Sequence, residues 1–173
     1  GGMGIQLAED EASLTEVFYS VTRQAETLFG NSDMYMEKYL VDARHIEIQV
    51  FGDGKGTVVY FGARECSIQR RHQKLLEETP PPRLPADIID DLARKCCQAL
   101  AQMQYASAGT LEFLYADGQF FFIEMNTRIQ VEHPITESVF GIDLVKLQLQ
   151  LAAGQQVPMV QTQIKSNGYS IEC

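Results

Sequence analysis

Hydrophobic and polar residues recur along the chain with two different periods, and the longer period, of three to four residues, is typical of helices. Apolar residues recur every three or four positions over residues 9–29, 85–103 and 143–153, a spacing that places them on one face of a helix. The first of these segments is followed by Gly30, and glycine commonly terminates helices. The pattern therefore predicts three amphipathic helices.

A faster, two-residue alternation predicts β-strands. The strands predicted in this way cover residues 34–40, 45–50, 57–62, 109–115, 119–125 and 168–173. Turn residues at 53–56 and 116–118 join two pairs of them into antiparallel hairpins. We expect residues 65–78 to form a strand and then a loop, and residues 126–134 to form a polar loop. Helices that alternate with antiparallel hairpins predict an α+β layered fold.

Composition and charge exclude some functional classes. The chain has 173 residues, 45% of them hydrophobic, and a formal net charge of −9. An acidic chain of this kind lacks the basic surface that is typical of nucleic-acid-binding proteins. It also lacks the apolar stretch of about 18 residues that a membrane-spanning helix needs. We therefore expect no nucleic acid and no membrane among its partners, although an acidic protein can still bind a phosphate locally.

Two glutamates in the second predicted hairpin are candidates for metal binding. Counting from the turn at Asp117 and Gly118 makes Glu112 and Glu124 near cross-strand neighbours. Neighbouring strands lie about 5 Å apart, and like charges placed opposite each other are destabilising. A bound Mg²⁺ resolves this repulsion, and Asn126, on the same face as Glu124, adds an amide oxygen. The alternative is that both glutamates face water, but Glu124 follows the run 120–123, which we expect to be buried, and this favours the metal.

Two other polar segments each have a functional and a structural interpretation. Residues 128–133 contain Arg128, whose planar guanidinium suits bicarbonate or phosphate, and Glu132, a candidate general base; the alternative is a solvated loop with an Arg–Glu ion pair. Residues 69–74 form a basic island in an acidic chain, suited to nucleotide phosphates, or else a charged surface loop. His45, taken alone, is more typical of a structural residue. The initial glycines suit a phosphate-binding loop or a linker equally well.

Several of these segments together are similar to one known family. The segments MYMEKYL, RHIEIQVFGDGKG, CSIQRRHQK, EETP, AGTLEF and FFIEMNTRIQVEHPITE resemble the biotin carboxylase family of ATP-grasp enzymes. The resemblance extends over nearly the whole chain. It implies an ATP-grasp fragment in which residues 1–40 are part of the lid subdomain. Residues 41–173 would then be the ATP-grasp core, truncated before the C-terminal part of the biotin carboxylase fold.

The resemblance implies a role for individual residues. The implied catalytic residues are Arg128, which holds bicarbonate, Glu132, which deprotonates it, and Lys74, which is directed at bicarbonate and phosphate. The implied metal ligands are Glu112, Glu124 and Asn126. The residues implied in binding ATP or bicarbonate are Gly1, Gly2, Gly4, Glu37, Lys38, Leu40, His45, Gln69, His72, Gln130 and Val131.

The implied reaction has two steps. Bicarbonate attacks the γ-phosphate of ATP bound to Mg²⁺ or Mn²⁺ to form carboxyphosphate, and CO₂ is then delivered to biotin on a carrier domain. The expected partners are therefore ATP, bicarbonate, a biotin carrier domain and a carboxyltransferase, in a cytoplasmic homo-oligomer. The final acceptor is not implied.

Some features depart from the family pattern, and other functions stay open. The family has a Rossmann-like domain before this region and a biotin-contacting arginine after the equivalent of Cys173, and Met3 stands where many members carry Arg or Lys. We therefore expect the chain to be an inactive fragment of an active ligase. The alternatives are another ATP-grasp carbon–nitrogen ligase, such as a carbamoyl phosphate synthetase, and a non-enzymatic interaction module.

Overall fold

The computed structural model describes residues 4–173, which form two compact units. The first unit contains the residues up to Val41 together with Arg71–Gln73, and the second contains Asp42–Arg70 and Lys74–Cys173. Each unit is described by itself. The predicted glycines Gly1 and Gly2 lie outside the described residues, whereas Gly4 lies in a turn.

The first unit is built around helix α1 (Glu11–Phe29), as predicted. Asp10 caps its start by accepting a hydrogen bond from the Ser13 amide at 2.7 Å, and Gly30 ends it with a left-handed φ of 66°. The strand that we predicted over residues 34–40 is wrong, because this segment has no regular secondary structure. Most of its side chains are exposed, so its alternation lacks the half-buried surface that a strand provides.

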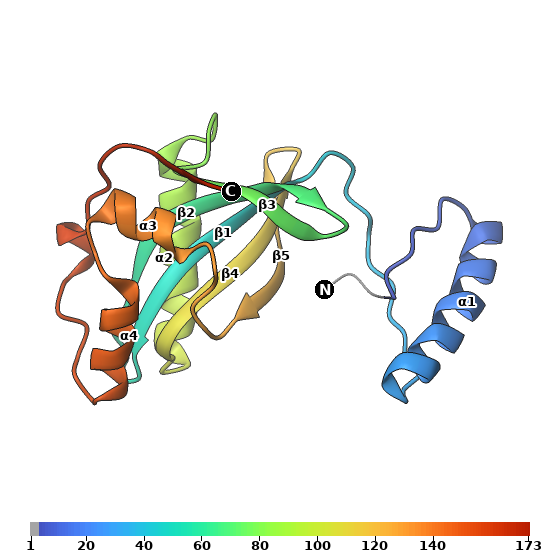
Figure 1. Ribbon diagram of the computed structural model, residues 1–173, viewed down its shortest axis with the longest axis horizontal. Coiled ribbons are helices and arrows are strands. Elements are labelled where there is room, and N and C mark those ends of the chain that lie inside the picture. The colour runs from blue at the N-terminus through green and yellow to red at the C-terminus, as the bar shows by residue number, and fades with distance from the viewer. Residues whose placement is uncertain (1–3) are drawn as a thin grey trace. The chain divides into compact units, whose positions relative to one another are not determined.

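The second unit contains a six-stranded sheet whose order is β5-β4-β1-β2-β3-β6 (Figure 1). The strands are β1 (Arg44–Asp53), β2 (Val58–Arg70), β3 (Gln73–Thr79), β4 (Ala106–Ala116), β5 (Gln119–Asn126) and β6 (Ser170–Glu172). Both predicted hairpins are confirmed, since β1 pairs with β2 and β4 pairs with β5, each antiparallel. The β4–β5 turn has positive φ at Asp117 (50°) and Gly118 (75°), as a two-residue hairpin turn requires.

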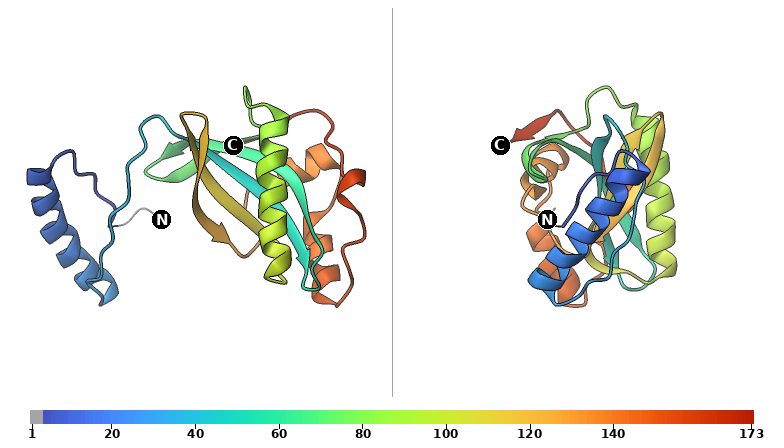
Figure 2. Two further views of the ribbon diagram at one scale, coloured as in Figure 1. Left: turned by 180° about the vertical axis from the view of Figure 1, so that it is seen from behind. Right: turned by 90° about the vertical axis from the view of Figure 1, so that its right-hand side faces the viewer.

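Helices cover both faces of the sheet, which confirms the predicted α+β layers (Figures 1 and 2). Helix α2 (Ala86–Gln102) lies across one face, where Ile89, Ala93 and Leu100 pack with Ile46 and Ile48 of β1. Helices α3 (His133–Phe140) and α4 (Leu144–Ala152) lie on the other face, and the α4 leucines pack with aromatic residues of β1 and β2. A short 3₁₀-helix, η1 (Gln161–Gln163), precedes β6. In the described part of the chain no helix is both long enough and apolar enough to cross a membrane.

Three other details of the prediction are corrected. Residues 65–78 form the end of β2 and most of β3 instead of a strand and a loop, and α3 begins within the predicted loop 126–134. The run 120–123 is not buried, since Phe122 is 59% exposed and Ile123 is 42% exposed. The reason is that β5 is an edge strand, so its apolar residues are covered less completely than those of a central strand.

Candidate functional site

Four charged side chains form a row across four neighbouring strands. Arg64 of β2 pairs with Glu47 of β1, Glu47 pairs with Glu112 of β4, and Glu112 pairs with Glu124 of β5. Cross-strand partners project from the same face of a sheet, and here Arg64 contacts Thr136 of α3, which identifies the face that α3 covers. Three adjacent carboxylates repel one another, so the row needs positive charge beyond Arg64.

Lys74 of β3 supplies this charge. Its Nζ lies 2.7 Å from Glu132 Oε1 and 3.1 Å from Glu112 Oε1, and it also forms an ion pair with Glu47. Burial disfavours the charged form of Lys74, but the carboxylates of Glu47, Glu132 and Glu112 outweigh this effect and raise its pKa. Lys74 is therefore a protonated ammonium group at neutral pH, held among three carboxylates.

The same contacts keep the carboxylates ionised. Burial alone would raise the pKa of Glu112, but the adjacent His45 ring and the charge of Lys74 lower it to about 2. Burial also opposes ionisation of Glu132, and its hydrogen bond from Lys74 reverses the balance, so its pKa is lowered. Glu132 is therefore in the ionised form that can accept a proton, and its lowered pKa makes it a weaker base than an ordinary glutamate.

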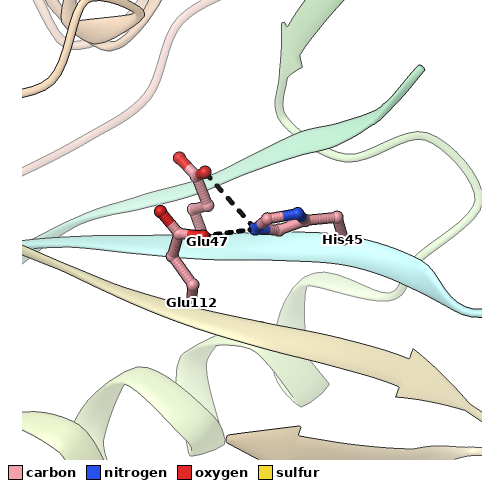
Figure 3. Close-up of side chains that lie close together, drawn as sticks. All are labelled: His45, Glu47 and Glu112. Carbon is pink, nitrogen blue, oxygen red and sulfur yellow. Dashed lines mark ion pairs between the residues drawn. The ribbon is translucent and has the colours of Figure 1, made fainter. Parts of the chain in front are cut away.

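His45 also belongs to this cluster (Figure 3). Its Nε2 lies 2.8 Å from Glu112 Oε2 and 3.5 Å from Glu47 Oε1. On the other side of the ring, Nδ1 lies 2.9 Å from the amide nitrogen of Gln69. Because that nitrogen can only donate, Nδ1 accepts, whereas Nε2 lies close to Glu112 but forms no hydrogen bond of adequate geometry among the described residues. The structure thus places the predicted nucleotide-site residue His45 beside the predicted metal ligand Glu112, and a second one, Gln69, on the opposite side of the His45 ring.

The predicted metal ligands lie together, and their chemistry fits Mg²⁺. Glu112 and Glu124 are cross-strand partners, so the predicted proximity is confirmed, and a register shift next to Glu112 makes the pairing direct. The Asn126 amide nitrogen lies 2.7 Å from Glu112 Oε1 and 3.3 Å from Glu124 Oε1, so all three side chains converge. Two carboxylates and an amide provide the hard oxygen donors that Mg²⁺ prefers.

The segment between β5 and α3 holds the other predicted residues of the bicarbonate pocket. Gln130 and Glu132 are each 6% exposed, whereas Val131 is 83% exposed. Arg128 is also exposed, and it donates to Asn126 Oδ1 at 3.3 Å and to the carbonyl of Ile129 at 3.1 Å. Glu132 pairs with Lys74, so the alternative of a solvated loop with an Arg128–Glu132 ion pair does not describe this segment.

Other predicted binding residues belong to the first unit, whereas the cluster belongs to the second. Glu37, Lys38 and Leu40 lie in its irregular segment, and the two charged residues are exposed. His72 lies at the β2–β3 turn, is exposed, and has a φ of 61°.

Two members of the cluster, Glu47 and Arg64, were not predicted from the sequence. They are 0% and 1% exposed, which is rare for charged residues unless they are paired. A signal for each is present in the sequence. Glu47 occupies the polar face of a strand that we expected to be buried on one face only, and Arg64 follows the apolar run 58–61 in the next strand.

A family model and curated proteins match the chain over most or all of its length. The model of the carbamoyl-phosphate synthase L chain ATP-binding domain matches residues 1–160. The biotin carboxylase of Haemophilus influenzae is 47% identical over 100% of this chain and 39% of its own length. The biotin carboxylase of Allochromatium vinosum is 46% identical over 100% of this chain and 38% of its own. The chain therefore spans well under half the length of these relatives.

Solved structures match the fold over the whole chain. A biotin carboxylase from Campylobacter jejuni in complex with a β,γ-ATP compound has a TM-score of 0.94 and 46% identity, covering 100% of this chain and 39% of that one. The biotin carboxylase domain dimer of 2-oxoglutarate carboxylase from Hydrogenobacter thermophilus, in complex with MgADP, ADP and bicarbonate, has a TM-score of 0.95 and 44% identity, covering 100% and 38%. The predicted α+β ATP-grasp fold is confirmed by these matches.

Proposed function

The chain belongs to the family of carbamoyl-phosphate synthase L chain ATP-binding domains, and from this premise we propose that it forms part of a biotin carboxylase. In this proposal the longer protein uses MgATP and bicarbonate to carboxylate biotin. One observation carries most of the argument: Lys74 lies among the carboxylates of Glu47, Glu112 and Glu132 at the buried end of the charged row. A protonated lysine beside an ionised glutamate is an arrangement suited to binding an anion and removing its proton.

The proposed roles follow from the charges and positions of these side chains. Glu132 accepts the proton of bicarbonate, and a bicarbonate oxygen then attacks the γ-phosphorus of ATP, so that ADP leaves and carboxyphosphate forms. Carboxyphosphate then breaks into phosphate and CO₂. The ureido nitrogen of biotin attacks the carbon of CO₂, and the released phosphate takes the proton that this nitrogen loses. Lys74 and Arg128 supply positive charge to the anions, and the buried Gln130 and the exposed main chain at Val131 complete the bicarbonate pocket.

We propose Glu112, Glu124 and Asn126 as the residues that hold Mg²⁺, since the two carboxylates lie next to each other and the Asn126 side chain contacts both of them through its amide nitrogen. When bound, Mg²⁺ supplies positive charge that neutralises the phosphates of ATP. His45 and Gln69 extend from this group, and we propose that they contact the nucleotide. Mn²⁺ as a substitute metal stays a prediction.

Other parts of the proposal concern the longer protein. The biotin carrier domain and the carboxyltransferase are proposed partners, and self-association is proposed because one matching structure is described as a dimer. The division into a lid at residues 1–40 and a core at residues 41–173 stays a prediction, as does the cytoplasmic location. The roles of Glu37, Lys38, Leu40, His72 and the initial glycines in binding ATP are proposed from the resemblance alone.

The proposal is tested by measuring ADP formation by the full-length protein with and without bicarbonate and free biotin. We expect formation of ADP that requires bicarbonate and is stimulated by biotin. Glu132→Gln should lower this rate at least about a hundredfold, as expected for loss of a general base, while MgATP binding measured by calorimetry stays unchanged. If Glu132→Gln formed ADP at the wild-type rate, Glu132 would not be the general base. If biotin did not stimulate ADP formation by the wild-type protein, the proposed function would be refuted.

The description of the matching family favours one second candidate, a carbamoyl phosphate synthetase. The two candidates differ in the nucleophile that follows bicarbonate activation, which is ammonia in one case and biotin in the other. The same assay distinguishes them when ammonia replaces biotin. Stimulation by ammonia and not by biotin would support the second candidate.

A further inference from the structure

Arg64 lies in the middle of β2, and no ligand-binding role has been assigned to it above. It is 1% exposed, and every N–H group of its guanidinium has an acceptor within the chain. The acceptors are Glu47 Oε2 (3.1 Å from Nη2 and 3.2 Å from Nε), Gln49 Oε1 (2.7 Å), Thr136 Oγ1 (3.0 Å), Gln130 Oε1 (3.0 Å) and Thr110 Oγ1 (3.3 Å). A guanidinium with no free donor cannot bind a substrate directly. Any effect of Arg64 on the site must therefore act through its neighbours.

Gln130 connects Arg64 to the predicted metal ligand. Its carboxamide oxygen accepts from Arg64 at 3.0 Å, and its nitrogen donates to Glu112 Oε1 at 2.8 Å. Arginine has only donors and an ionised carboxylate has only acceptors. The reversed carboxamide would face Arg64 with its NH₂ group and Glu112 with its oxygen, and both contacts would be repulsive. The charges on either side therefore permit one orientation of Gln130.

Arg64 also determines which oxygen of the Glu47 carboxylate is available to Lys74 and His45. It takes Oε2, so that Oε1 is the oxygen left for Lys74 and for His45. This arrangement leaves the Lys74 ammonium free to contact Glu132 and Glu112 as well. One buried cation thus orients two side chains that both lead to Glu112.

We infer that Arg64 is a positioning residue for the proposed ATP and bicarbonate site, acting chiefly through Gln130 to keep a hydrogen-bond donor on Glu112. The inference rests on the proposed function, because it concerns the same site. Lysine at position 64 would keep the charge beside Glu47 but would lack the planar fork that reaches several acceptors at once. Among the uncharged partners of Arg64, Gln130 is the one that leads to the site, because Gln49, Thr110 and Thr136 form no hydrogen bond with Lys74 or Glu112 among the described residues.

The test compares Arg64→Lys with Thr136→Val in the full-length protein. Thr136→Val removes one acceptor of the same guanidinium at nearly constant volume and leaves the bond to Gln130 in place, and so serves as the structural control. Arg64→Lys should lower kcat for bicarbonate-dependent ADP formation by about tenfold to a hundredfold, the range seen when a group that orients a metal ligand is lost. Thr136→Val should lower Tm but leave kcat within about twofold of wild type.

Two further measurements separate positioning from simple loss of stability. In a double-mutant cycle, Arg64→Lys should change kcat by less than about threefold once Gln130→Met is present, because coupled residues are not additive. The Gln130 side-chain amide, observed by NMR with ¹⁵N-labelled glutamine, should be protected from hydrogen exchange in wild type and in Thr136→Val, and lose protection in Arg64→Lys. The inference would be overturned if Arg64→Lys lowered kcat by the same factor with and without Gln130→Met. It would also be overturned if the Gln130 side-chain amide stayed protected from hydrogen exchange in Arg64→Lys.

A second comparison covers the case in which Arg64→Lys does not fold. Arg64→Gln combined with Glu47→Gln removes the buried ion pair as a whole, so that no buried charge is left without a partner. Its kcat should lie about tenfold or more below that of Glu47→Gln alone, and an equal kcat would refute the role of Arg64. A wild-type protein without bicarbonate-dependent ADP formation would refute the proposed function alone, because the exchange measurement on Gln130 still tests the inference.

Discussion

Glu112 and Glu124 face each other directly across β4 and β5, although both carry acidic side chains. The pairing is followed immediately by a register shift between Glu112 and Phe113, so that the two carboxylates meet at an irregularity of the ladder. Bulges of this kind redirect side chains next to functional sites. The Asn126 amide bridges the two carboxylates, which identifies this point as the place where the sheet favours positive charge.

Glu124→Gln should weaken the binding of Mg²⁺ without unfolding the protein. Glu124 is exposed, so its replacement leaves the packing intact, while the metal loses one of its two carboxylate ligands. We expect the Mg²⁺ concentration for half-maximal ATP binding, measured by calorimetry in the full-length protein, to rise by about tenfold or more. Asp91→Asn on α2 removes an exposed carboxylate elsewhere and should leave the Mg²⁺ dependence unchanged. Equal Mg²⁺ dependence in both variants would contradict the proposed metal site.

Glu112 should contribute to the loss of stability in acid. Its pKa is about 2 in the folded protein, against an ordinary value of 4.5. A lowered pKa means that the contribution is present above about pH 4.5 and is lost as the pH falls toward about 2; it amounts to at most about 3.5 kcal/mol. The lowered pKa of Glu132 acts in the same direction, whereas burial and neighbouring carboxylates raise the pKa of Glu77, which acts in the opposite direction.

Glu112→Gln should therefore flatten the acid limb of a plot of unfolding free energy against pH. Urea unfolding at several pH values between about 2 and 6 measures this slope. Asp87→Asn, an exposed position in the first turn of α2, should keep the wild-type slope. An unchanged slope in Glu112→Gln would show that the contacts with His45 and Lys74 do not stabilise the ionised carboxylate.

The sequence was sufficient to predict the parts of this site that depend on local geometry. The proximity of Glu112 and Glu124 could be predicted because a two-residue turn at Asp117 and Gly118 sets the approximate register of both strands, but their direct pairing depends on the register shift next to Glu112, which the sequence does not reveal. The convergence of Asn126 followed from the two-residue period of a strand. The distance in sequence from the turn is enough to bring these side chains near one another, although not to fix the exact pairs.

The buried part of the site could not be predicted in this way. Arg64 and Glu47 are buried because α3 covers the polar face of the sheet, and α3 is only eight residues long, too short for its periodicity to be recognised. The run 120–123 was misjudged for a related reason, since hydrophobicity does not show which strand lies at the edge of a sheet. Both errors concern the arrangement of elements that are distant in sequence.

Arg128→Lys should affect bicarbonate more than ATP. Arg128 is exposed and donates to Asn126 Oδ1 and to a carbonyl of its own segment, so its guanidinium is held beside the proposed pocket without supporting the core. Lysine keeps the charge but cannot form two parallel hydrogen bonds to a planar anion. In steady-state assays we expect KM for bicarbonate to rise about tenfold and KM for MgATP to change by less than about twofold. Arg94→Lys on the exposed face of α2 is the control, and parallel changes in both KM values would contradict a specific role in bicarbonate binding.

Lys74→Met should cost both stability and activity, because one ammonium group balances three carboxylates. Breaking a buried pair by removing one partner is strongly destabilising, by about 3 kcal/mol or more, since the remaining carboxylates lie in a covered site with less positive charge. This loss of unfolding free energy should become smaller as the pH falls, because protonation of the carboxylates removes the repulsion among them. We expect kcat for bicarbonate-dependent ADP formation to fall at least about a hundredfold.

Lys95→Met is the matched control for this variant. Lys95 also pairs with a carboxylate, that of Asp91 at 2.7 Å, but its side chain is 69% exposed, against 20% for Lys74. Exposed ion pairs contribute less than about 1 kcal/mol, so this variant should unfold close to the wild-type temperature and keep its activity. If both substitutions lowered the free energy of unfolding equally, the burial of Lys74 among its carboxylates would not be what stabilises the site. A Lys74→Met protein that is less stable yet fully active would instead limit Lys74 to a structural role and leave the proposed chemistry to Arg128 and the metal.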